Sequence, residues 1–66
     1  MNNYNIITYF NDGTSIILPV SYEKEYELRR DVTNIGVNGL LQKIENKFEY
    51  FPPHKIDKIE VVETKP

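Results

Sequence analysis

Apolar and polar side chains alternate along two segments near the start of the chain. Tyr4 to Phe10 and Thr14 to Val20 are rich in β-branched and aromatic residues, and Asn11-Asp12-Gly13 separates them. Two such runs around a short Asn/Asp/Gly segment predict an antiparallel β-hairpin. The second run contains Pro19, which has no N–H to donate, so we expect an edge strand or a strand terminus there.

Two loop geometries give this hairpin opposite buried faces. A two-residue type I′ turn at Asp12-Gly13 would place Ile7 opposite Leu18. A three-residue loop closed by a left-handed Gly13 would place Ile6 opposite Leu18 instead. We predict the three-residue loop, because it gathers the better core on one face of the sheet. The side chains of that face are Tyr4, Ile6, Phe10, Ile16, Leu18 and Val20.

The opposite face of the hairpin keeps more apolar surface than a solvated sheet face needs. Its apolar residues are Ile7, Tyr9 and Ile17. An uncovered apolar patch marks a place where a partner or a second copy of the chain docks. We therefore take Ile7, Tyr9 and Ile17 as the candidate partner-binding residues.

A helix signal follows the second strand. Ser21 is a typical N-cap, and acidic residues followed by two arginines suit the helix dipole, so we predict a helix over Tyr22 to about Asp31. We expect the helix to end at or before Gly36, which can form the C-terminal cap. Asn38-Gly39 is a second signal that ends a helix. The apolar stripe that would pack on the sheet consists of Tyr22, Tyr26, Leu28 and Val32.

The segment from residue 37 to residue 48 fits two structures. Its apolar residues follow the i, i+3, i+4, i+7 pattern, which favours a short second helix over roughly 39 to 47. The alternative is a hairpin in which Leu40 to Ile44 pairs with Phe48 to Phe51 across Glu45-Asn46-Lys47. Periodicity favours the helix, whereas the short length and the flanking strands favour the hairpin. The helix is our prediction and the hairpin stays open.

The last third of the chain predicts two strands separated by Pro52-Pro53. Ile59 and Val61 alternate with polar residues, as in a half-buried strand. Together the elements predict a single α+β domain over residues 1 to 64, with Lys65-Pro66 as a short frayed end. We expect a small antiparallel sheet of three to five strands with one or two helices packed on one face.

The length and composition of the chain favour association with a partner. A chain of 66 residues has room for one domain, and it buries only about 60% of the surface of its unfolded form. It has no cysteine, which removes disulfides and most structural zinc sites as sources of stability. A protein partner or a homodimer is therefore expected. The formal charge of −2 does not attract a polyphosphate, so nucleic acid is a less favoured partner.

The chain lacks the sequence features of membrane insertion and of export. It has no apolar run near the roughly 18 residues that span a bilayer, and no charged segment followed by an apolar signal region. We therefore expect no membrane partner and a cytoplasmic location.

Residue types and spacing also argue against catalysis. No nucleophile-elbow motif surrounds Ser15 or Ser21, and the one histidine, His54, supplies a single ligand where a catalytic zinc needs about three. Gly36-Val37-Asn38-Gly39 lacks the spacing of the phosphate-binding loops. We expect no enzymatic activity, no cofactor and no metal.

An alternative function uses the basic and aromatic residues of the second half. Lys43, Lys47, Tyr50, Phe51 and His54 could form a surface that stacks the bases of a single-stranded nucleic acid. Each lysine has an acidic residue close by in the sequence, which weakens its field. This function is therefore the alternative to protein binding.

The order of parts resembles a class of phage proteins. The hairpin with Asn11-Asp12-Gly13, the Glu- and Tyr-rich Ser21 to Leu28, and Tyr50 to Ile56 closing on Ile59-Glu60-Val61 resemble small accessory proteins of phages and mobile elements of Gram-positive bacteria. Such proteins often bind and inhibit a host enzyme or defence system. The resemblance implies a non-enzymatic protein-interaction module that acts in the host cytoplasm.

Overall fold

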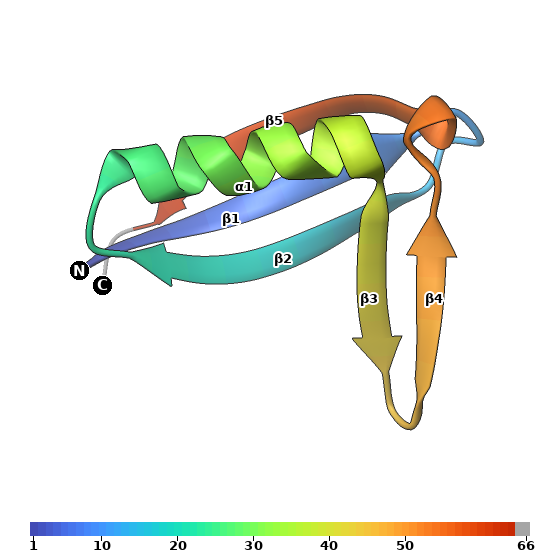
Figure 1. The fold of residues 1–66 in the computed structure, drawn as a ribbon, viewed down its shortest axis with the longest axis horizontal. Coiled ribbons are helices and arrows are strands. Elements are labelled where there is room, and N and C mark those ends of the chain that lie inside the picture. The colour runs from blue at the N-terminus through green and yellow to red at the C-terminus, as the bar shows by residue number, and fades with distance from the viewer. Residues whose placement is uncertain (65–66) are drawn as a thin grey trace.

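The computed structural model describes residues 1 to 64, which form a three-stranded sheet, one helix and a projecting hairpin (Figure 1). Strands β1 (Asn2–Phe10), β2 (Ser15–Tyr22) and β5 (Ile56–Thr64) form an antiparallel sheet in the order β2-β1-β5. Helix α1 (Glu25–Asn38) covers one face of this sheet. The predicted α+β class is confirmed. Lys65-Pro66 lies outside the described residues.

The pairing of β1 with β2 has the predicted register. Ile6 lies opposite Leu18, and the Phe10 N–H donates to the Thr14 carbonyl at 2.9 Å. The loop therefore has three residues, and Gly13 closes it with a φ of +90°. Such a φ is easily adopted only by glycine, which explains the residue type at this position.

Side chains of the same loop tie it to two parts of the chain. The Asp12 carboxylate accepts hydrogen bonds from the Thr14 hydroxyl at 2.6 Å and from the Thr14 N–H at 2.9 Å. These bonds lower the pKa of Asp12 below its usual value. The Asn11 N–H donates to the Lys55 carbonyl and its side-chain amide to the His54 carbonyl, both at 2.9 Å. The loop thus fixes the 3₁₀ turn η1 (Pro53–Lys55), which leads into β5.

The hydrophobic core lies between α1 and the sheet. Ile6, in the central strand, is its most buried member, with 1% of its surface exposed. The Phe10 ring stacks on the Phe51 ring with centroids 4.7 Å apart, so Phe51 belongs to the core. The buried apolar residues are Ile6, Phe10, Leu28, Ile35 and Leu40.

The helix begins later than predicted. Tyr22 lies in β2, opposite Asn2, and α1 starts at Glu25. The prediction of a helix from Tyr22 was wrong because strand pairing takes precedence over the local capping signal of Ser21. The Glu27 carboxylate instead accepts the Lys24 N–H at 3.2 Å at the start of the helix.

The helix also ends later than predicted. Gly36 lies inside α1, and Gly39 ends it with a φ of +89° and an N–H bonded to the Ile35 carbonyl.

The packing face of the helix agrees in part with the predicted stripe. Leu28 is buried and Val32 packs against the core, as predicted, whereas Tyr26 is 61% exposed. Ile35 is also buried, and the predicted stripe omitted it because the predicted helix ended too early.

Residues 40 to 51 form a hairpin, so the predicted second helix is wrong. The alternative hairpin is confirmed, but Lys47 pairs with Ile44, so the turn has the two residues Glu45-Asn46 and not the expected three. Strand β3 (Leu40–Ile44) pairs with β4 (Lys47–Phe51) in a separate two-stranded sheet. This hairpin, called the arm below, projects away from the main sheet (Figure 1). Leu40 and Phe51, a facing pair, anchor its base in the core. The hairpin satisfies the backbone hydrogen bonds of the segment by pairing β3 with β4, while it keeps Leu40 and Phe51 together in the core.

The two helix glycines give a matched test of the fold. A Cβ at Gly39 would lie 2.4 Å from the Phe51 carbonyl oxygen, and the backbone conformation there suits only glycine. Gly39→Ala should therefore lower the free energy of unfolding by about 2 kcal/mol or more. Gly36→Ala meets no atom within 4 Å and should raise it by about 1 kcal/mol through helix propensity. Urea denaturation measures both, and equal stability of the two variants would contradict the assigned helix end.

Candidate functional site

The structure gathers no metal-binding cluster among residues 1 to 64. No three His, Cys, Asp or Glu side chains in this part of the chain could hold a metal ion together. The segment from Gly36 to Gly39 forms the last turn and the C-cap of α1. A helix C-terminus carries a negative partial charge, which repels the phosphate group that a glycine loop would bind.

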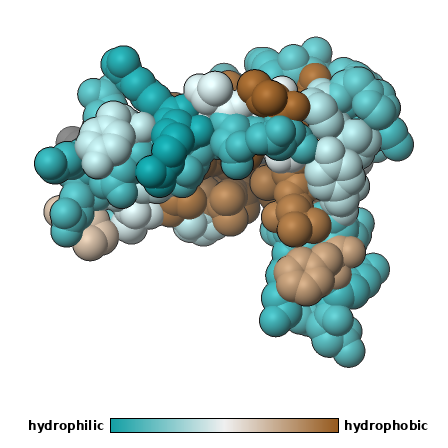
Figure 2. Space-filling view, viewed as in Figure 1, coloured by the Kyte–Doolittle hydropathy of each residue, from teal (hydrophilic) through white to brown (hydrophobic). Residues whose placement is uncertain are grey.

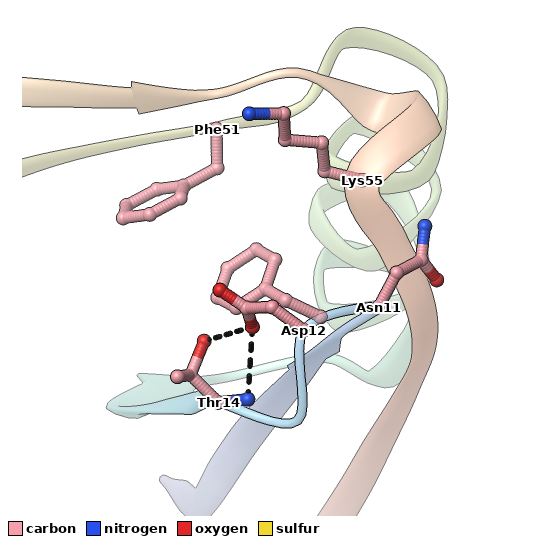
Figure 3. A pocket seen from close by; sticks show the side chains of 6 residues that line it. Asn11, Asp12, Thr14, Phe51 and Lys55 are labelled. Atoms are coloured by element: carbon pink, nitrogen blue, oxygen red, sulfur yellow. Dashed lines mark hydrogen bonds between the residues drawn. The ribbon is translucent and has the colours of Figure 1, made fainter.

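A small pocket lies beside the loop between β1 and β2 (Figure 3). It has a volume of about 420 Å³, and the aromatic rings of Phe10 and Phe51 form part of its wall. The polar groups at its mouth already serve the fold, because Asp12 binds Thr14 and Asn11 binds η1. The pocket is best described as the joint between the loop and the base of the arm.

The three predicted partner-binding residues do share one face of the sheet. Ile7 lies directly opposite Ile17, and Tyr9 follows on the same side of β1, away from α1. Ile17 is 58% exposed, whereas Ile7 and Tyr9 are half-buried. The structure adds Val62, 48% exposed, which the sequence did not place there because its strand pairs with β1 from far along the chain. This set is called the sheet-face patch.

Charged residues shield part of the sheet-face patch. The Lys58 ammonium lies 5.0 Å from the centroid of the Tyr9 ring. Hydrogen bonding to the Glu60 carboxylate raises the pKa of Tyr9 above its usual value. Because both charged groups lie beside Tyr9, the apolar surface open to a partner is reduced to the aliphatic side chains of the patch.

The five residues of the nucleic-acid alternative do not come together. Lys43 and Tyr50 share one face of the arm, whereas Lys47 lies on the opposite face. Phe51 packs in the core, and His54 lies in η1. Of the five residues, only Lys43 and Tyr50 therefore share a surface, and the exposed ring of Phe48 lies beside them on the same face.

The arm carries an apolar stripe that the sequence reasoning missed. Leu41 pairs with Tyr50, and Phe48 follows on the same face. These three side chains, called the arm stripe, are 62%, 57% and 66% exposed, respectively. Tyr50 also donates its hydroxyl to the Asn38 carbonyl at 2.7 Å, which links the arm to the end of α1. Alternation along the strand predicts such a stripe once the segment is known to be a hairpin.

A groove continues the arm stripe into the body of the molecule. It lies between α1, β2 and the base of the arm, and it has a volume of about 490 Å³. Figure 2 shows apolar surface below the helix that extends down onto the arm. This corner groove is lined by Ile6, Leu18, Val20, Tyr22, Asp31, Asn34, Ile35, Asn38, Gly39, Leu40, Leu41 and Tyr50.

One polar pair stands at the rim of the corner groove. The Tyr22 hydroxyl donates to the Asp31 carboxylate at 2.6 Å. Burial, together with this hydrogen bond and the charge of Asp31, raises the pKa of Tyr22 to about 12. The pair joins the end of β2 to α1 and fixes the width of the groove at that point.

Comparisons of the chain with protein-family models, with curated proteins and with solved structures find no match. None of the helices within residues 1 to 64 has the length and apolar character needed to cross a membrane.

The Tyr22 pair predicts a specific loss of stability at high pH. The native chain keeps the Tyr22 proton up to about pH 12, whereas an unfolded chain releases it near 10.0. Because the native state then binds more protons, its stability falls as pH rises through this window. Urea denaturation at several pH values should show a shallower fall for Tyr22→Phe than for the wild type. Asp31→Asn should lower the midpoint of Tyr22 in a tyrosinate absorbance titration, and an unchanged titration would contradict the assigned pair.

Proposed function

We propose that this chain is a non-enzymatic protein-interaction module that binds a partner protein with the arm stripe and the corner groove. One observation carries the proposal: Leu41, Phe48 and Tyr50 form a continuous apolar surface, each more than half exposed, on a hairpin that projects from the body. Exposed apolar surface of this kind, next to a groove, is typical of interaction sites.

The energetics of the arm stripe suit binding better than folding. These side chains lie outside the buried core, so they contribute little burial to the stability of the free chain. Burying a large apolar side chain is worth about 1.5 to 3 kcal/mol, so these side chains would supply a substantial part of the free energy of binding. Phe48 and Tyr50 also belong to the rigid aromatic residues that supply contact area at low entropic cost.

The rim of the surface indicates the chemistry of the partner. Asp31 and Asn34 border the corner groove, and Lys43 lies over the Phe48 ring, 5.9 Å from its centroid. A partner that fits presents an apolar ridge, such as the face of a helix, with a donor for Asp31 at its side. The resemblance to phage accessory proteins supports a bacterial host enzyme or defence protein as this partner, with inhibition by occlusion.

Affinity capture with matched variants tests the proposal. The immobilised chain is exposed to a lysate of a Gram-positive bacterium, and the retained protein is identified by mass spectrometry and titrated in purified form. Phe48→Asp should weaken its binding at least about 30-fold, as for a binding hot spot. Ile17→Asp, at an equally exposed position in the sheet-face patch, should leave binding within threefold. Circular dichroism checks that both variants keep the fold.

Other outcomes would contradict the proposal. Loss of binding with Ile17→Asp but not with Phe48→Asp would assign the partner to the sheet-face patch, as the sequence predicts. Binding of single-stranded DNA or RNA at low salt, with an affinity that falls steeply as salt is added, would favour the nucleic-acid alternative.

A further inference from the structure

The register of the sheet shows which backbone groups of β5 face outward. Because Phe10 donates to Thr14, the even-numbered residues of β1 bond to β2 and the odd-numbered ones to β5. Ile7 pairs with Glu60, so the even-numbered residues of β5 bond inward. The peptide groups of Ile59 and Val61 therefore point away from the sheet, along its free edge.

The two edges of the sheet differ in how they are protected. On β2, Pro19 faces Asn5 at a position whose N–H would point outward, so the proline removes a donor from that edge. The arm stands on the β2 side as well, because it shares the corner groove with β2. Strand β5 extends from Ile56 to Thr64 without a proline, and its register shift falls between Ile56 and Lys58, so its regular pairing with β1 runs from Lys58 to Thr64. A regular edge strand without a proline is a template for pairing with another strand.

Charge selects one way of pairing β5 with itself. In an antiparallel pair centred on Ile59, Lys58 of each copy lies opposite Glu60 of the other, at a site where side chains approach closely. A pair centred on Glu60 would place the two copies of Glu60 opposite each other. A pair centred on Val61 would place each Glu60 opposite Val62 of the other copy, without an ion pair. Within residues 1 to 64, Lys58 and Glu60 join none of the ion pairs of the chain.

We propose that β5 pairs with β5 of a second copy about a two-fold axis at Ile59, which joins the two sheets into one. Lys58, Ile59 and Glu60 of each strand form the centre of this pair, and the register shift at Asp57 lies just outside it. Ile59 lies opposite its own copy on the helix side, and the two Lys58–Glu60 pairs lie on the other side. This dimer goes beyond the proposed partner binding, since the arm stripe and the corner groove lie on the β2 side and stay accessible.

Charge reversal tests the dimer. Light scattering and sedimentation equilibrium, over a range of protein concentrations, should show a dimer for the wild type. Lys58→Glu alone, or Glu60→Lys alone, replaces two attractive pairs by two repulsive ones and should weaken dimerisation about tenfold or more. The double variant Lys58→Glu/Glu60→Lys restores opposite charges and should dimerise like the wild type. Urea denaturation checks that each variant stays folded.

Amide hydrogen exchange adds a readout that is specific to the edge. The N–H groups of Ile59 and Val61 should exchange more slowly as protein concentration rises, because they become bonded only in the dimer. A wild type that stays monomeric, a double variant that fails to dimerise, or a dimer abolished by Ile17→Asp but not by the charge reversals would overturn the proposal. Phe48→Asp should leave the dimer intact, so failure of partner binding and failure of dimerisation are distinguishable.

Discussion

The three-residue loop between β1 and β2 is the constraint on which the rest of the structure depends. By pairing Phe10 with Thr14, it assigns alternate peptide groups of β1 to β2 and to β5. The same alternation directs Ile6 toward α1 and Ile7 toward the opposite face. One residue fewer in the loop would exchange the two faces, so that the core side chains of β2 would lose their partners in β1. Gly13, with its positive φ, makes the longer loop possible.

The apolar residues of this small chain are divided between the buried core and the exposed surface. Five of them are buried between α1 and the sheet, and a ring of half-buried ones surrounds them. Others stay more than half exposed, as do the three side chains of the arm stripe and Ile17 of the sheet-face patch. Because the exposed residues contribute little to the core, their replacement costs the fold little. The exposed positions can therefore vary in sequence while the core stays the same.

The features that the sequence predicts correctly are those that depend on residues close together in the chain. The first hairpin and its register follow from turn residues and alternation, both readable within a few positions, and the same alternation places Ile7 and Ile17 on one face. The start of α1 does not follow, because the pairing of Tyr22 with a distant Asn2 overrides a good capping signal. The arm was ambiguous because its apolar spacing fits a helix and a hairpin alike. The arm stripe can be predicted only once the hairpin is chosen, because a strand directs the neighbouring residues Tyr50 and Phe51 to opposite faces.

The position of β1 has a consequence for how the protein is made. This strand is synthesised before its neighbours, yet it occupies the centre of the sheet, and β5 is the last of its two partners to be synthesised. Until residue 64 has left the ribosome, the odd-numbered peptide groups of β1 have no partner, and the nascent hairpin has an open edge at this strand. Pairing across so long a loop is slow compared with helix or hairpin formation. A growing chain is therefore most exposed to mispairing, or to capture by a chaperone, in the interval before β5 arrives.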